Sequence, residues 1–197
     1  MFGDHGKLYV PAELVQIYRK EVIPLANVVT PNQFEAEKLT GMKIKTFEDA
    51  SKALFNLHEL GPKLVVLTSM ILEGCSDKMF IVASQRHHDD EGNEDEEGKT
   101  TTRQTKQVVW RIESPILPGT YTGTGDLTAA LFLAWTAKDP GNLGNTLEKV
   151  VSTMFTVIQT TQKESDGTIQ GKELKLIKSK NVIENPPKLF KAEQINI

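Results

Sequence analysis

The chain has 197 residues, of which 39% are hydrophobic and 25% charged, which is the composition of an ordinary globular protein. Its formal net charge of −3, from 23 basic and 26 acidic residues, argues against nucleic acid as the main partner, because phosphate binding needs clustered Lys and Arg. Cys75 is the only cysteine and no apolar run reaches the roughly 20 residues that span a bilayer, so we expect a cytoplasmic protein with no disulfide and no membrane segment.

The first part of the sequence alternates helices with short apolar strands. Apolar spacing and turn residues predict helices at 12–21, 32–39 and 47–60, and strands at 26–30 and 64–69. The segment LVVLTS at 64–69 is apolar without interruption until its last two residues. Such a run is typical of a strand that is buried on both faces of a parallel sheet.

The second part of the sequence continues the same pattern. We predict strands at 79–84 and 107–113, long helices at 125–137 and 143–163, a short helix near 171–178 and a last strand near 188–191. The first two strands would form a hairpin whose tip, at about 87–106, is acidic and flexible. Alternating short strands and helices without internal repeats predict a single α/β domain.

The segment GTGDLTAALFLAW, which begins at Gly123, places two glycines and an acid at the start of an apolar helix. The helix is apolar nearly all round, so we expect it to be buried. Gly123 and Gly125 allow the backbone to approach a ligand closely. The first N–H groups of a helix lack intrahelical partners and carry the positive end of its dipole, so they can form an anion site without a lysine.

Asp126 follows directly in the first turn of this helix. One interpretation is that it complements the helix dipole, which stabilises a helix by about 0.3–1 kcal/mol. That interpretation leaves the second glycine unexplained. An anion site beside a carboxylate explains both, because the amides would stabilise a transferred phosphoryl group while the carboxylate takes the proton of an attacking hydroxyl. The combination suits phosphoryl transfer to an alcohol.

The segment TPNQFEAE, which begins at Thr30, has two interpretations. Asn32 and Glu35 have the spacing of a capping box, which would make them structural. Alternatively this corner faces a ligand, because ligands of open parallel sheets lie beyond the carboxyl ends of the strands. Thr68 and Ser69 end the strand 64–69 in the same way, so the two strand ends would share one site.

Four motifs occur in one order along the chain. They are Gly-Asp followed by Tyr-Val-Pro (3–4 and 9–11), Thr-Pro-Asn-Gln-Phe-Glu (30–35), Val-Leu-Thr-Ser (66–69) and Gly-Thr-Gly-Asp (123–126). With them the chain, from residue 3 to its end, resembles the pyridoxal kinases, vitamin B6 kinases of the ribokinase superfamily. The resemblance implies a three-layer α/β sandwich with a mostly parallel sheet. It also implies a homodimer that uses ATP to phosphorylate the 5′-hydroxymethyl group of pyridoxal, pyridoxine or pyridoxamine, and so forms pyridoxal 5′-phosphate from pyridoxal.

The same resemblance assigns roles to individual residues. It makes Asp126 the catalytic base, at the substrate, and makes Gly123, Thr124 and Gly125 the anion hole. Asn32, Glu35, Thr68 and Ser69 would contact ATP, as would Leu117 and Gly119 of the segment PILPGT beside the adenine. Asp4 and Glu35 would lie at the site of Mg²⁺ or another divalent cation, Thr30 would bind K⁺ or Na⁺, and Tyr9 would lie near the vitamin.

The chain also departs from the family pattern. The family usually reads Asp-Pro-Val-Met/Leu-Gly-Asp where this chain begins Met-Phe-Gly-Asp, and about the first third of a typical member has no counterpart. Residues 1–197 would then be the C-terminal portion of a single, N-terminally truncated ribokinase-like kinase domain. Two alternatives stay open: another kinase of this superfamily, such as one that acts on hydroxymethylpyrimidine, or a non-catalytic product that binds nucleotide or dimerises.

Overall fold

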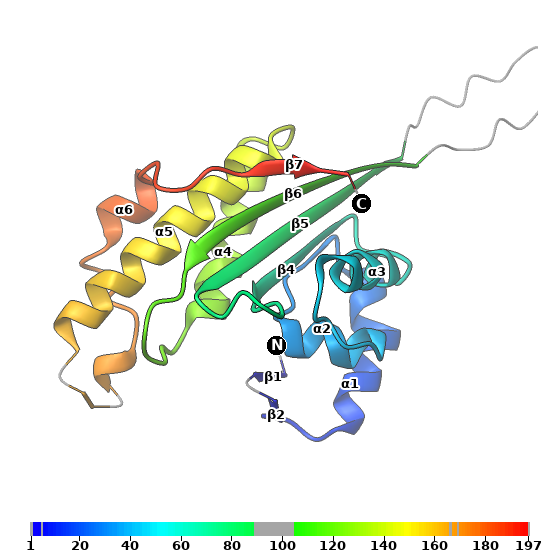
Figure 1. Cartoon of the computed structure of the whole chain (residues 1–197), viewed down its shortest axis with the longest axis horizontal. Coiled ribbons are helices and arrows are strands. Elements are labelled where there is room, and N and C mark those ends of the chain that lie inside the picture. Colours follow the sequence, from blue (N-terminus) through cyan, green and yellow to red (C-terminus); the bar gives the residue numbers. More distant parts are fainter. Residues whose placement is uncertain (1, 5, 89–104, 166, 169, 197) are drawn as a thin grey trace, which may run out of the picture.

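The computed structural model describes residues 2–4, 6–88, 105–165, 167–168 and 170–196. They form three layers, with a five-stranded sheet between two groups of helices (Figure 1). None of the helices in this part of the chain is both long and apolar enough to cross a membrane. Most of the acidic tip expected at about 87–106 lies outside the described residues.

The sheet has the strand order β3-β4-β5-β6-β7. Its strands are Val28–Val29 (β3), Leu64–Met70 (β4), Lys78–His88 (β5), Thr105–Pro115 (β6) and Glu193–Ile195 (β7). Only β3 and β4 are parallel, and the other three neighbouring pairs are antiparallel. The α/β class is therefore confirmed, but the sheet of this chain is mixed rather than mostly parallel, because β5 and β6 pair as a hairpin. A separate two-stranded ribbon pairs Gly3–Asp4 (β1) with Lys7–Leu8 (β2).

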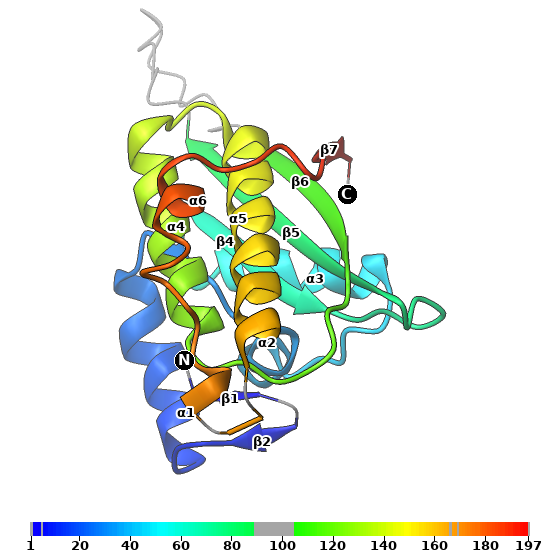
Figure 2. The same ribbon diagram turned by 90° about the vertical axis from the view of Figure 1, so that its left-hand side faces the viewer.

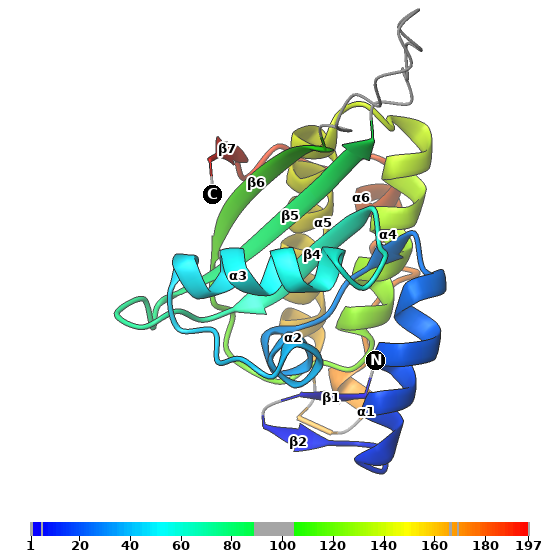
Figure 3. The same cartoon turned by 90° about the vertical axis from the view of Figure 1, so that its right-hand side faces the viewer.

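The helices divide between the two faces of the sheet. One face carries α1 (Glu13–Ile17), α2 (Gln33–Thr40) and α3 (Phe47–His58), which lie in front in Figure 3. The other face carries α4 (Thr124–Lys138), α5 (Leu143–Glu164) and α6 (Lys180–Glu184), which lie in front in Figure 2. Short turns of other helix types occupy Tyr18–Val22 (η1), Ile23–Leu25 (η2) and Gln170–Lys172 (η3).

The central strand β4 explains why its sequence is apolar without a break. Leu64 and Val66 belong to the core under α4 and α5, whereas Val65 and Leu67 belong to the core under α1, α2 and α3. All four side chains are at most 5% exposed. Successive residues of a strand point to opposite faces, so a strand between two helix layers needs an apolar residue at every position.

Two elements differ from the prediction near their ends. The helix expected at 12–21 is α-helical only over Glu13–Ile17. It continues as a π-helical turn and then as a 3₁₀ turn. Pro24 has no N–H to donate to the carbonyl of Lys20, so the regular α pattern cannot continue there. The strand expected at 26–30 keeps only Val28–Val29.

The C-terminal prediction was wrong in detail. Residues 173–179 are not helical, because Glu173 pairs with Thr122 in a β-bridge and the N–H of Lys175 donates to Oγ1 of Thr161 at 3.1 Å. The last strand begins at Glu193 rather than near 188. The preceding segment lies along α5, where the N–H of Ala192 donates to Oε1 of Glu148 at 3.0 Å.

Helix α4 is less buried than its composition indicates. Leu131, Phe132 and Trp135 face the core and are at most 9% exposed. On the opposite side Leu133 is 67% exposed, and four alanines beside it are exposed as well. The expectation of a fully buried helix was therefore wrong, because no described element packs on its outer side.

Candidate functional site

Two strand ends meet at one corner of the sheet, as the polar residues after each strand indicate. Asn32 and Thr68 form a parallel β-bridge beyond the ends of the parallel pair β3 and β4. The N–H of Thr68 donates to the carbonyl of Pro31 at 3.0 Å, and the hydroxyl of Thr68 lies 3.4 Å from the same oxygen. Thr30 and Ser69 adjoin these residues in the chain, so the four polar residues that the sequence singled out share this corner.

The capping box predicted at the start of α2 is present. Oδ1 of Asn32 accepts from the N–H of Glu35 at 2.8 Å, and Oε2 of Glu35 accepts from the N–H of Asn32 at 3.2 Å. The same two side chains also hold β1. Oε1 of Glu35 accepts from the N–H of Phe2 at 2.6 Å, and Nδ2 of Asn32 donates to the carbonyl of Gly3 at 2.8 Å. Glu35, 2% exposed, is therefore a buried connection between β1 and α2.

This connection brings the β1–β2 ribbon, with Asp4 and Tyr9, to the corner. The N–H of Tyr9 donates to the carbonyl of Phe2 at 2.9 Å, while its side chain is 71% exposed. Partial desolvation of the phenol, followed by the negative charges of Asp4 and Glu35, raises the pKa of Tyr9 above its ordinary value of 10.0. Tyr9 is therefore within the electrostatic influence of both carboxylates.

Ser69 has a conformation that its sequence did not reveal. Its φ of 51° lies in the left-handed region, where it is the only residue other than glycine among those described. The pairing of β4 with β5 shifts between Leu67 and Met70, so Ser69 lies in a β-bulge. Bulges and left-handed residues other than glycine occur often beside functional sites, where they redirect a side chain.

Gln33 has a role that sequence reasoning missed. Its Oε1 accepts from the N–H of Ile71 at 2.9 Å, and its Nε2 donates to the carbonyl of Ile44 at 2.6 Å. The first residue of α2 therefore holds the segment that leaves β4 just after the bulge. The only sequence signal for this contact was the position of Gln33 inside the motif that begins at Thr30.

The start of α4 is built differently. Gly123 is the N-cap with a φ of 90°, a conformation that favours glycine, and no side chain caps the helix. The first hydrogen bond of the helix runs from the N–H of Leu127 to the carbonyl of Gly123, at 3.0 Å. Among the described residues, the N–H groups of Thr124, Gly125 and Asp126 therefore have no acceptor. Three free amides and the dipole make this end of α4 attractive to an anion.

Gly125 and Asp126 are both exposed in the first turn of α4. A Cβ added to Gly125 would meet no atom within 4 Å, so packing in this structure does not require a glycine there. The position is open instead to whatever lies over the helix start. Asp126 is thus a carboxylate at the rim of a patch of unpaired amides.

The loop that leads into α4 contains Leu117 and Gly119. Gly119 has a φ of 113°, and the hydroxyl of Tyr121 donates across the turn to the carbonyl of Pro118 at 2.7 Å. The N–H of Thr122 then donates to the carbonyl of Lys172 at 3.1 Å, which fixes the loop to the C-terminal segment. In all three views the start of α4 lies at the same end of the sheet as α2 and the β1–β2 ribbon (Figures 1, 2 and 3).

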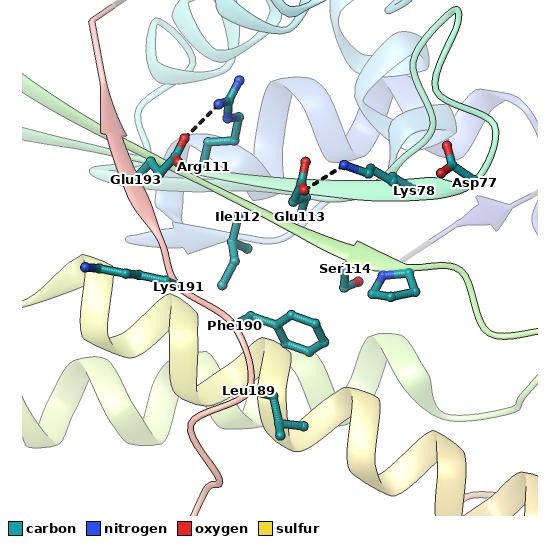
Figure 4. A pocket seen from close by; sticks show the side chains of 11 residues that line it. Asp77, Lys78, Arg111, Ile112, Glu113, Ser114, Leu189, Phe190, Lys191 and Glu193 are labelled. Atoms are coloured by element: carbon teal, nitrogen blue, oxygen red, sulfur yellow. Dashed lines mark hydrogen bonds and ion pairs between the residues drawn. The ribbon is translucent and has the colours of Figure 1, made fainter.

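A cavity of about 480 Å³ lies elsewhere, between the sheet and residues 189–193 (Figure 4). Two ion pairs cross its rim, Lys78 with Glu113 and Arg111 with Glu193, each at 2.8 Å. None of the predicted site residues lines it. The candidate site is therefore an open corner of the described structure rather than this cavity.

Known proteins resemble nearly the whole chain in sequence. Pyridoxal kinase of Arabidopsis thaliana is 40% identical over 199 residues, which cover 98% of this chain and 59% of that protein. Pyridoxal kinase of Homo sapiens is 37% identical, with 97% of this chain and 61% of that protein covered. The chain thus spans about 60% of the length of these relatives.

Solved structures agree with the sequence relatives. Pyridoxal kinase from Leishmania donovani in complex with ADP and pyridoxamine superposes with a TM-score of 0.82 at 25% identity, covering 99% of this chain and 60% of that one. PdxK from Plasmodium falciparum, with AMP-PNP and PL, gives 0.80 at 28% identity, covering 100% and 59%. The fold of the chain is therefore the ribokinase-like fold of these enzymes.

A sequence model of one kinase family, described as phosphomethylpyrimidine kinase, matches residues 1–153. That match includes the corner at Thr30–Glu35, the bulge at Ser69 and the glycines and acid at the start of α4. The chain belongs to the phosphomethylpyrimidine kinase family.

Proposed function

We propose that the chain carries the nucleotide site and the catalytic base of a pyridoxal kinase, which phosphorylates the 5′-hydroxymethyl group of pyridoxal, pyridoxine or pyridoxamine with ATP. The observation that carries the proposal is the uncapped start of α4, with Asp126 in its first turn, at the same end of the sheet as Asn32 and Thr68. The names of the relatives, and the nucleotides and vitamers in the solved complexes, support the substrate assignment.

In this proposal the start of α4 performs the transfer. The carboxylate of Asp126 accepts the proton of the 5′-hydroxyl as that oxygen attacks the γ-phosphorus of ATP, and ADP leaves. The amides of Gly123, Thr124 and Gly125 stabilise the negative charge of the transferred group. Because these N–H groups of the helix start are fixed before substrate binds, they need no reorganisation during the reaction.

The β3–β4 corner would hold the rest of the nucleotide. Asn32, Thr68 and Ser69 have amide and hydroxyl groups that suit phosphate oxygens, and Ser69 has a left-handed backbone conformation within the bulge. Leu117 and Gly119 would lie beside the adenine. Tyr9, which is exposed directly after β2, would contact the vitamin.

Mg²⁺ is the cation that we propose for the acidic side of this corner. Asp4, Glu35 and Thr30 offer oxygen ligands of the type that Mg²⁺ prefers, and Mg²⁺ is usually bound by one or two carboxylates together with phosphate oxygens. Glu35 also has a structural role, because its carboxylate accepts hydrogen bonds from backbone N–H groups and so holds the corner together. A bound divalent cation would supply charge neutralisation for the phosphates, and Thr30 would contribute to a K⁺ or Na⁺ site. We further propose that the active protein is a cytosolic homodimer.

Nucleotide binding tests the proposal on the 197-residue chain directly. Calorimetric titration with Mg²⁺ and AMP-PNP, which keeps a γ-phosphoryl group, should give saturable binding. Asp126→Asn should change the dissociation constant by no more than about twofold, whereas Gly125→Val should weaken binding by about tenfold or more, since a side chain there enters the space above the amides. Asp139→Asn, at the other end of α4, is the matched control. Failure of the unchanged chain to bind AMP-PNP contradicts the proposal.

Phosphoryl transfer tests the base and the substrate. By itself the chain should form little pyridoxal 5′-phosphate, because it spans about 60% of the relatives' length. Supplemented with the segment described below, it should phosphorylate pyridoxal in preference to hydroxymethylpyrimidine. Asp126→Asn should lower that rate by roughly 10²–10⁴-fold. Retained turnover would remove Asp126 from its role, and preference for hydroxymethylpyrimidine would favour the other kinase.

A further inference from the structure

The outer side of α4 is a continuous apolar stripe. Exposed apolar residues recur along this side at spacings of three and four positions. They are Ala129, Ala130, Leu133, Ala134 and Ala137. The side chains that face the core come from the opposite side of the helix. A helix at the surface of a globular protein normally presents polar residues to water, so a stripe of this kind indicates a covered surface.

The adjacent edge of the sheet is also open. Strand β3 pairs with β4 on one side, and within the described part of the chain no strand pairs with its other side. The sequence around it, Asn-Val-Val-Thr at 27–30, has neither a charge nor a proline that would block pairing. An unprotected edge strand is a template for another strand.

The opposite edge of the sheet makes the contrast clear. Strand β7 has three residues, and Glu193 at its start forms an ion pair with Arg111. Although β3 is shorter still, it carries no such charge, and a charged residue on an edge strand is a typical protection against pairing with another strand. Only the β3 side therefore has the character of an interface.

Exposed apolar residues lie on the other side of this open edge too. Ile17, Val22 and Leu25, from α1 through η2, are 42%, 45% and 85% exposed. In Figure 3 the sheet runs from β7 on the left to β3 on the right, and α1 and α4 both lie at the right-hand edge. Figure 2, from the opposite side, places α1 and α4 together on the left. Both helix layers thus reach the open edge.

We propose that this surface, made of β3, the α4 stripe and the exposed residues from α1 through η2, binds a polypeptide that continues the fold. The occupant adds a strand beside β3 and covers both helices with apolar side chains. Its counterpart in the relatives is the remaining 40% or so of their length, since this chain is covered almost completely while they are covered to 59–61%.

A binding experiment tests this surface without nucleotide or turnover. The 197-residue chain is co-expressed with the segment of the Arabidopsis thaliana pyridoxal kinase that it does not match, and light scattering after size exclusion gives the stoichiometry. We expect a one-to-one complex. Leu133→Lys should weaken it by about tenfold or more, because a charge is then buried in the interface. Leu189→Lys, an exposed leucine at the far side of the sheet, is the control and should bind normally.

Two results would overturn the inference. One is a chain that stays unbound, or that binds equally well with Leu133→Lys. The other is a homodimer of the chain that Leu133→Lys dissolves and the added segment does not displace, which would make a second copy the occupant. Circular dichroism of Leu133→Lys checks that the variant folds. Complex formation without phosphoryl transfer would contradict the proposed function but leave this interface standing.

Discussion

Helices α2 and α4 both begin at the same end of the sheet, but their starts are built in opposite ways. At α2 the side chains of Asn32 and Glu35 satisfy backbone N–H groups of the helix start and of β1, and Glu35 is buried. At α4 a glycine begins the helix, no side chain caps it, and Asp126 is exposed beside unpaired N–H groups.

The difference indicates that the start of α2 serves stability and the start of α4 serves chemistry. At α2 the capping box occupies the N–H groups of Asn32 and Glu35 and ties the helix start to β1, so α2 contributes a fixed corner. An uncapped start costs stability, typically about 1 kcal/mol relative to a good cap, and leaves its amides available. We therefore expect substitutions at α2 to act mainly on folding, and substitutions at α4 mainly on nucleotide binding and transfer.

The largest effect on stability should come from Glu35→Ala. The variant leaves the buried N–H groups of Phe2, Gly3 and Asn32 without their acceptor, and each unsatisfied buried group costs about 1–3 kcal/mol. Urea denaturation should show a loss of roughly 3 kcal/mol or more. Glu48→Ala, an exposed carboxylate paired with Lys52, should change stability by less than about 1 kcal/mol. A similarly small loss for Glu35→Ala would show that the buried connection between β1 and α2 does not stabilise the protein.

The two glycines of α4 should respond differently to alanine. Gly123→Ala forces a Cβ into a left-handed conformation and should destabilise the chain by about 1–2 kcal/mol. Gly125→Ala lies in helical backbone with open space around it, so stability should be unchanged or raised by up to about 1 kcal/mol. Thermal unfolding compares the two variants. Equal destabilisation would mean that Gly125, too, is required by the fold.

Asp126→Ala should have a smaller effect on stability. An exposed acid in a first turn interacts with the helix dipole for about 0.3–1 kcal/mol, so the loss in urea should stay within that range. Glu13→Ala, the first-turn acid of α1, is the matched control and should behave alike. A loss as large as that of Glu35→Ala would contradict the division between the two helix starts.

The smallest expected effect concerns the phenol of Tyr9. Its pKa is raised by partial desolvation and then by Asp4 and Glu35, so Asp4→Asn should move it back towards 10.0 without unfolding the protein. An ultraviolet difference titration of the tyrosines, with Tyr9→Phe to identify the signal, measures the change. An unchanged pKa of Tyr9 in Asp4→Asn would contradict the influence of Asp4 on the phenol.

The sequence predicted best what depends on neighbouring residues. The capping box of Asn32 and Glu35 follows from local geometry, and it is present. The apolar run of β4 also indicated burial on both faces correctly. The meeting of the two strand ends could be expected as well, because parallel neighbours end at one edge of a sheet.

What the sequence could not supply depends on distant partners. The antiparallel pairing of β4 with β5, the bulge at Ser69 and the contacts of Gln33 are set by which segments lie beside β4. The apolar outer side of α4 indicated burial, but no described element covers it. Composition indicates that a side is suited to burial, but it does not say whether the covering element lies in the same chain. The roles that the resemblance assigns to individual site residues, from Asp4 and Thr30 to Asp126, stay predictions.

The bulge in β4 has a further consequence for how this protein can vary. Three steps along β4, from Leu67 to Met70, match two along β5, from Val82 to Phe80. The extra residue returns Met70 to the same core as Leu67, and it falls after the four buried residues rather than among them. Thr68 and Ser69 are thereby released from the alternation that governs the strand. Substitutions at these two positions can therefore alter the corner while the packing of both layers stays the same, within the residue types that the left-handed conformation of position 69 accepts.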